Sequence, residues 1–119
     1  ITIPEGVTTI GSSAFNACES LTSITIPEGV TTIGSSAFNA CSSLTSITLP
    51  EGVTTIGDKT FYLCSSLTSV YCKPTTPPTL GSSVFYGFAT IFVPSASVNA
   101  YKSANKWSYY ASKIVGYDF

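Results

Sequence analysis

The stretch ITIPEGVTTIGSSAFNACSSLTS, residues 24–46, decides the fold because the chain is built from copies of it. Residues 1–23 repeat it with a single difference, Glu19 in place of Ser42, and residues 47–69 repeat it with six differences. Self-similarity at a fixed period of about 20 to 50 residues is typical of repeat architectures. The sequence therefore predicts a solenoid, in which each 23-residue copy forms one coil and successive coils stack on each other.

A looser fourth copy fills residues 70–90, one residue longer than the others before Leu80 and three residues shorter after Phe88. Beyond it the repeat pattern fades. We therefore expect two parts, a solenoid of about four coils over residues 1–93 and a C-terminal capping segment over residues 94–119. The capping segment has a physical reason, because a bare last coil would expose an edge strand and the hydrophobic core to water.

Each copy contains a segment with the alternation of a strand. Residues 24–26, Ile-Thr-Ile, place apolar and polar side chains on opposite faces, and Pro27 ends the strand because proline lacks the backbone donor. Residues 35–41 are too few for more than a turn or two of helix. We therefore expect an α/β solenoid with one short parallel strand per coil and short helical turns on its other sides.

The C-terminal segment has the features of a cap. Residues 97–105 predict a short helix that begins at Ser97 as its N-cap, with three apolar residues along one side: Val98, Tyr101 and Ala104. Trp107 adds bulk, and residues 114–115, Ile-Val, predict a last short strand. Such a segment would cover the hydrophobic end of the last coil.

Stacking turns each repeated residue into a ladder, with neighbours about 4.8 Å apart where strands pair. The copies predict a buried aromatic ladder, in which offset stacking adds to the burial of area, at Phe15, Phe38, Phe61 and Phe85. They also predict an aliphatic ladder at the first strand position, at Ile1, Ile24, Ile47 and Val70. One coil cannot bury its own apolar residues, so stability would be a sum over neighbouring coils.

These residues resemble a known family. The 23-residue unit and an Ala-Phe-x-x-Cys signature are similar to the BspA-like leucine-rich repeat of secreted and surface proteins, best known from anaerobic gut and oral bacteria. The first copy carries the signature from Ala14 to Cys18, whereas the third has Thr60 for the alanine and the fourth has Phe88 for the cysteine. The tail is similar to the C-terminal cap common in these proteins.

The resemblance implies a non-enzymatic binding or adhesion module, secreted or at the cell surface, that recognises a protein or a glycan through its repeat surface. A structural spacer that displays neighbouring domains is the alternative. Because the chain begins at Ile1, inside the repeat pattern, we expect it to be a piece of a longer protein with its export signal upstream. The uncapped N-terminal edge is also open to self-association.

Composition and charge narrow the classes of partner. Charged residues make up 9% of the 119 residues, and all five basic residues are lysines, for a net charge of −1. A phosphate backbone needs clustered lysines or arginines, so this inventory argues against nucleic acid as a partner. No stretch approaches the roughly 18 apolar residues of a spanning helix, so we expect no membrane insertion by this segment.

The residue inventory also argues against an enzyme. There is no histidine for a catalytic triad and no arginine to clamp a phosphate or carboxylate. One carboxylate recurs in each Pro-Glu-Gly turn, at Glu5, Glu28 and Glu51. As a column they would offer a calcium site or the acid/base pair of a glycoside hydrolase, but solvated turn residues are the simpler interpretation. We expect no cofactor, no metal and no catalytic residue.

The cysteines follow the repeat. Cys18, Cys41 and Cys64 come three residues after the ladder phenylalanines, and Cys72 takes a strand position. The favoured interpretation is a core ladder, because free cysteine packs as a small hydrophobic residue. A disulfide between neighbouring coils is the rival interpretation, although parallel side chains have poor geometry for it. A zinc site is weaker, since paired C-x-x-C spacing and histidine are both missing.

The outward strand position gives the candidate binding residues. Thr25, Thr48 and Tyr71 hold it in successive copies, and Phe92 holds it at the end of the repeat. Exposed aromatic side chains are enriched at recognition hot spots, and solenoids often bind on this face. We therefore predict a binding surface formed by these four residues. The alternative is that threonine merely suits a strand and that both aromatic side chains pack against the cap.

Overall fold

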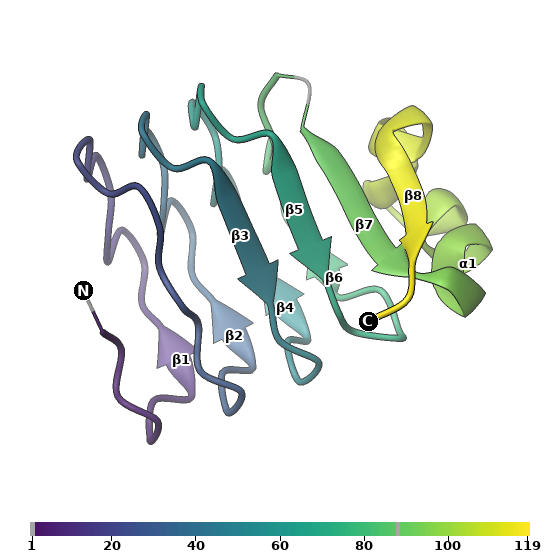
Figure 1. Ribbon diagram of the computed structural model, residues 1–119, viewed down its shortest axis with the longest axis horizontal. Coiled ribbons are helices and arrows are strands. Elements are labelled where there is room, and N and C mark those ends of the chain that lie inside the picture. The colour runs from purple at the N-terminus through teal and green to yellow at the C-terminus, as the bar shows by residue number, and fades with distance from the viewer. Residues whose placement is uncertain (1, 88) are drawn as a thin grey trace.

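The computed structural model describes residues 2–87 and 89–119, which form two layers of parallel strands (Figure 1). The first sheet has the order β1-β2-β4-β6 and consists of two-residue strands: β1 (Thr9–Ile10), β2 (Thr32–Ile33), β4 (Thr55–Ile56) and β6 (Thr79–Leu80). The second has the order β3-β5-β7-β8: β3 (Ser46–Leu49), β5 (Ser69–Cys72), β7 (Thr90–Pro94) and β8 (Ile114–Tyr117).

The strand pairs keep the register of the repeat. Thr32 lies opposite Thr55, twenty-three residues further along the chain. In the fourth copy the separation becomes twenty-four residues, from Thr55 to Thr79, and then twenty-one, from Ser69 to Thr90. The insertion and the deletion of that copy therefore fall in its connections, and the strands stay aligned. A repeat fold with short parallel strands is confirmed.

The prediction of one strand per coil is wrong, because the Thr-Thr-Ile step after the Pro-Glu-Gly turn forms a second strand. Thr55 is exposed and Ile56 is buried, so even two residues alternate between solvent and core. The predicted strand at residues 24–26 is not formed, although these residues lie within the described range. The sheet on that side begins one copy later, with β3.

The predicted helical turns are also wrong, since residues 35–41 form turns without a helix. Ser36 and Ala40 have φ angles of 58° and 60°, in the left-handed region that a right-handed helix cannot accommodate. These left-handed residues turn alternate N–H groups toward the next copy. Phe38 N–H, for example, donates to the carbonyl oxygen of Thr60 at 2.9 Å. Hydrogen bonds therefore join the copies on this side without extended strands.

The aromatic ladder forms as predicted, with Phe38, Phe61 and Phe85 buried in the core and Phe15 half-buried against it. Its ring centroids are 5.3, 5.5 and 5.8 Å apart and its planes lie within 6° of parallel, along Phe15, Phe38, Phe61 and Phe85. In the aliphatic ladder Ile47 and Val70 are buried and Ile24 is half-buried. The ladder position of Ile1 and the signature position of Phe88 lie outside the described residues. The two ladders form the continuous core that a single copy could not supply.

The cysteines pack in the core as free thiols. Cys41, Cys64 and Cys72 are buried and Cys18 is half-buried. The Sγ of Cys64 donates a hydrogen bond to the carbonyl oxygen of Phe38, one copy earlier, at 3.0 Å. Burial raises the pKa of Cys64 to about 11 and that of Cys72 to about 12. The core interpretation is confirmed for the three buried thiols, which the fold keeps protonated.

The C-terminal segment covers the last copy with η1 (Ser95–Ser97), α1 (Val98–Ser103), η2 (Trp107–Lys113) and β8 (Figure 1). The predicted last strand is confirmed, because β8 pairs in parallel with β7. Tyr101 and Trp107 are fully buried. Tyr101 Oη donates to the carbonyl oxygen of Pro74 at 2.6 Å, and Trp107 Nε1 donates to that of Pro78 at 2.8 Å. The segment is therefore held in place by buried hydrogen bonds as well as by the burial of apolar surface.

The predicted cap helix exists but is shorter than residues 97–105. Ser97 precedes α1, yet its side chain does not cap the helix. Its Oγ donates instead to the carbonyl oxygen of Thr75 at 2.7 Å, so the hydroxyl ties the helix start to the preceding copy. Among the helices in the described part of the chain, none has both the length and the apolar character needed to cross a bilayer.

Candidate binding surface on the second sheet

The outer face of β3, β5 and β7 brings three of the predicted binding residues into one row. Thr48 lies opposite Tyr71 in the strand register, and Tyr71 lies opposite Phe92. Thr48 is exposed, whereas Tyr71 and Phe92 are half-buried. Thr25 is exposed as well, but it belongs to the segment that forms no strand pairs. The row therefore changes from small and polar to aromatic as it approaches the C-terminal segment.

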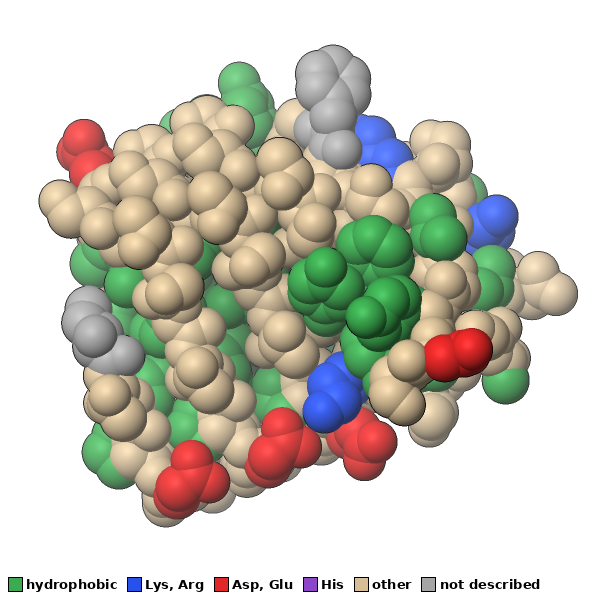
Figure 2. Space-filling model, in the orientation of Figure 1, with side chains coloured by type: hydrophobic (Ala, Val, Ile, Leu, Met, Phe, Trp, Pro, Cys, Tyr) green, Lys and Arg blue, Asp and Glu red, His purple; other side chains and the backbone are tan. Residues whose placement is uncertain are grey.

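Four aromatic side chains gather on this face, and we call Tyr71, Phe92, Tyr117 and Phe119 the aromatic cluster. The Tyr71 and Phe92 rings stack with centroids 4.9 Å apart and planes 12° from parallel. Tyr117 meets them edge-on at 5.6 and 5.5 Å, and Phe119 lies 4.9 Å from Tyr117. Figure 2 shows a compact hydrophobic area on this face.

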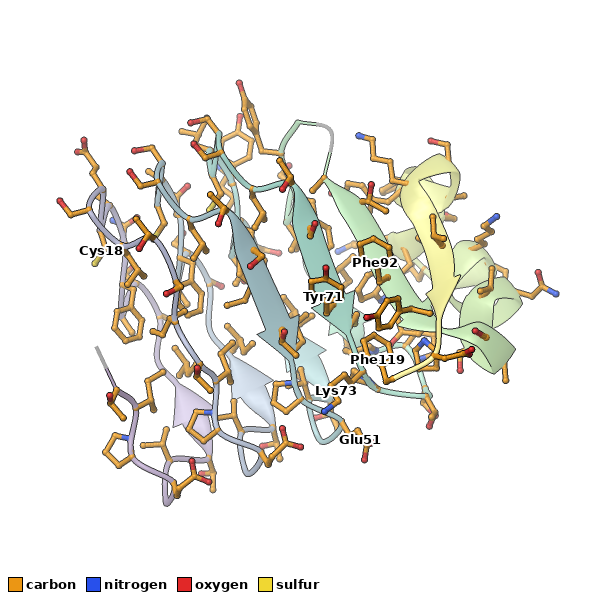
Figure 3. All side chains as sticks on the ribbon, viewed as in Figure 1. Cys18, Glu51, Tyr71, Lys73, Phe92 and Phe119 are labelled. Atoms are coloured by element: carbon orange, nitrogen blue, oxygen red, sulfur yellow. The ribbon has the colours of Figure 1, made fainter. Side chains whose placement is uncertain are left out.

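A groove opens where the row steps from threonine to tyrosine. Its volume is about 380 Å³, and we call it the aromatic groove; its lining residues are Thr48, Tyr71, Lys73, Tyr117, Asp118 and Phe119. The step exists because the short side chain of Thr48 stands beside the much longer one of Tyr71. Figure 3 shows Tyr71, Phe92 and Phe119 close together, with Lys73 below them.

The charged groups of the groove are one cation and one carboxylate. Asp118 Oδ1 accepts a hydrogen bond from Ser95 Oγ at 2.9 Å, which holds the carboxylate against the start of the C-terminal segment. Lys73 leaves β5 at its carboxyl end and lines the groove from below. Glu51 is exposed in the turn that follows β3, on the same side as Lys73 (Figure 3). Neither sign of charge dominates the groove itself.

Two of the groove residues were predicted and four were not. Thr48 and Tyr71 line it, Phe92 backs the ring of Tyr71, and Thr25 lies outside it. The sequence did not predict the other four lining residues, which are Lys73, Tyr117, Asp118 and Phe119. The sequence did contain a signal for Tyr117. The segment Ile-Val-Gly-Tyr of β8 can be aligned with Ile-Phe-Val-Pro of β7, and this alignment places the tyrosine at the end of a strand. The charged residues carried no such signal.

Other parts of the surface offer weaker candidates. Within residues 2–87 and 89–119, no three His, Cys, Asp or Glu side chains gather as potential metal ligands. A larger hollow of about 550 Å³ lies beside residues 18–23, but its lining contains no aromatic ring. Aromatic side chains supply large contact area at low conformational cost, so the smaller aromatic groove is the stronger recognition site.

Comparison with known proteins supports the repeat interpretation. The model of the BspA type leucine-rich repeat region matches residues 1–113, with six copies. None of the curated proteins compared with the chain matches it. The match covers nearly the whole chain and agrees with the repeat register of the parallel strands. The chain therefore belongs to the BspA-type leucine-rich repeat family.

Proposed function

We propose that the chain is a non-enzymatic binding module of a secreted or cell-surface protein, and that it recognises its partner through the outer face of β3, β5, β7 and β8. The observation that carries the proposal is the aromatic cluster, which stays partly exposed beside the aromatic groove. Tyr117 is 44% exposed and Phe119 is 50% exposed, so the cap strand does not bury the aromatic face. Exposed aromatic groups around a groove are typical of recognition sites.

A division of the chain into a repeat part and a cap is compatible with the same function. We propose that residues 1–93 form a solenoid that supplies the strand face and that residues 94–119 form its cap. Under this division the cap has a second role, because it contributes Tyr117 and Phe119 to the groove. A binding site built from both parts would depend on the pairing of β7 with β8.

The test is a binding screen with matched variants. The wild-type chain and two variants, Tyr71→Thr and Phe92→Thr, are presented to an array of matrix proteins and glycans. Threonine is the residue at the position equivalent to Tyr71 in the first three copies. Both changes should weaken whichever interaction is found, whereas Tyr109→Ser should not, because Tyr109 is 79% exposed and lies outside the aromatic cluster. Unchanged binding by the two cluster variants would contradict the proposed site.

A structural spacer is the second candidate, and the near identity of the first two copies favours it. Interchangeable copies set a length rather than a site. Deleting residues 24–46 tests only this idea, because the aromatic groove lies entirely in later residues. A spacer would keep its function when Tyr71 is replaced and lose it in proportion to the copies removed. A binding module would show the opposite pattern.

A further inference from the structure

The ring of Tyr71 has two faces in different surroundings. Phe92 covers one face, with its ring 4.9 Å away and nearly parallel. On the other side of β5 lies β3, where the residue opposite Tyr71 is Thr48. A threonine side chain is too short to cover an aromatic ring, so the second face borders the aromatic groove. The groove therefore combines an aromatic ring with a neighbouring threonine.

We propose that this groove binds one sugar ring of a neutral glycan, with the ring stacked on the free face of Tyr71. The inference rests on the proposed binding function and names its ligand class. A pyranose presents C–H groups on its flat faces and hydroxyl groups around its edge. The groove offers the complementary arrangement: an aromatic face, and donors and acceptors at the rim from Thr48, Lys73 and Asp118.

The charges around the groove favour a neutral ligand. Lys73 is the one cation that lines it, and Asp118 offsets that charge. The Pro-Glu-Gly turns add exposed carboxylates at Glu5, Glu28 and Glu51. Figure 2 shows acidic side chains along the lower edge of this face. A polyanion such as a sulfated or sialylated glycan would meet repulsion from this border. A neutral sugar would instead use the carboxylate and the ammonium group as hydrogen-bond partners.

The size and composition of the face favour a glycan over a protein. The groove, at about 380 Å³, lies near the lower end of the roughly 300–1,000 Å³ of small-ligand sites. A protein partner would need to cover about 800 Å². Beyond the aromatic cluster the outward row continues through threonine, a residue type that is under-represented at protein hot spots.

The experiment titrates the chain with soluble neutral oligosaccharides of glucose, galactose and mannose, and follows the aromatic proton resonances by NMR. We expect at least one series to shift the Tyr71 ring signals. Tyr71→Thr should weaken that binding about tenfold, because it removes the stacking surface, and Tyr71→Phe should retain it. Tyr109→Ser should bind like the wild type. Threonine is native at the equivalent position of three copies, so Tyr71→Thr should fold, and circular dichroism checks this.

Three results would overturn the inference. One is the absence of binding to every neutral oligosaccharide at millimolar concentration, and another is tighter binding to sialylated or sulfated versions than to neutral ones. The third is neutral-sugar binding that Tyr71→Thr leaves unchanged. If a protein or a cationic peptide binds and Tyr71→Thr abolishes that interaction while neutral sugars fail, the binding module stands and only the glycan assignment falls. If no member of the screen binds, both fall.

Discussion

Cys64 Sγ lies 3.0 Å from the carbonyl oxygen of Phe38, the ladder phenylalanine of the copy before, and the same contact joins Cys41 to Phe15 at 3.2 Å. In the second and third copies, the thiol that follows the phenylalanine therefore bonds to the copy before it. This explains why the signature pairs a phenylalanine with a cysteine three residues later: one fills the core and the other ties adjacent copies together.

Replacing Cys64 by alanine should lower the free energy of unfolding by about 1–3 kcal/mol, because the change removes a buried side chain and its hydrogen bond to the Phe38 carbonyl oxygen, which then keeps only the backbone bond from Cys41 N–H. Cys18→Ala is the matched control, since Cys18 is only half-buried, and it should cost clearly less. Urea denaturation of both variants measures the difference. Equal losses would mean that the thiol contact contributes nothing specific.

The raised thiol pKa predicts a loss of stability at alkaline pH. Burial raises the pKa of Cys64 from 9.0 to about 11, so the folded state holds the proton more tightly than the unfolded chain. The resulting stabilisation is complete below pH 9 and disappears as the pH rises toward 11. Unfolding free energies measured across this range should fall, and the slope should be shallower in Cys64→Ala. A slope that is the same in both proteins would assign the pH dependence to other groups.

Gly57 is predicted to tolerate no side chain. A Cβ at this position would lie 2.5 Å from Ser35 N and 2.8 Å from the carbonyl carbon of Gly34, both backbone atoms of the preceding copy. Gly57→Ala should therefore force the copies apart and cost about 1–3 kcal/mol or more. Gly52→Ala is the control in the same copy, because its Cβ would meet only ordinary contacts at 3.7 and 3.8 Å. Thermal unfolding distinguishes the two.

The left-handed turns predict a stabilising change. Ala40 has a φ of 60°, where a Cβ is unfavourable and glycine is not. Ala40→Gly should raise the free energy of unfolding by about 0.5–1 kcal/mol after the entropy of the more flexible unfolded chain is subtracted. Ala37→Gly, at a buried position without a positive φ, should destabilise instead. If both glycines destabilise, the turn is not strained.

The repeat and its core could be predicted from the sequence, but the first sheet and the left-handed turns could not. The period of twenty-three residues and the phenylalanine ladder followed from repetition, and the last strand followed from its Ile-Val step. The first sheet was missed because two residues are too few to show a period. The left-handed turns were missed because serine and alanine occupy them, without the glycine that normally marks such a conformation.

The binding surface could be predicted only in part from the sequence, for a different reason. Tyr71 and Phe92 were found because they replace threonine in the outward row of the repeat. Tyr117 and Phe119 reach the same face from a segment that does not repeat, and only the pairing of β8 with β7 brings them there. Repetition predicts the position of repeated residues. It does not predict which side chains of the C-terminal segment pack against those residues.

The difference in side-chain size between Thr48 and Tyr71, which opens the aromatic groove, can be removed by a single substitution. Thr48→Tyr would add a third ring to the outward row, where it should stack on the free face of Tyr71 as Phe92 stacks on the other, and so fill the aromatic groove. Because the position faces solvent and neighbouring aromatic residues pair well across strands, folding stability should change by no more than about 1 kcal/mol.

The same variant separates binding from folding. Thr48→Tyr should abolish ligand binding in the oligosaccharide titration while leaving the unfolding curve nearly unchanged. Thr55→Tyr supplies the control, because Thr55 is an exposed strand threonine of the same copy on the opposite sheet, and it should bind like the wild type. Full binding by Thr48→Tyr would show that recognition does not use the space beside Tyr71. The aromatic cluster would then be better explained as packing between the strand face and the C-terminal segment.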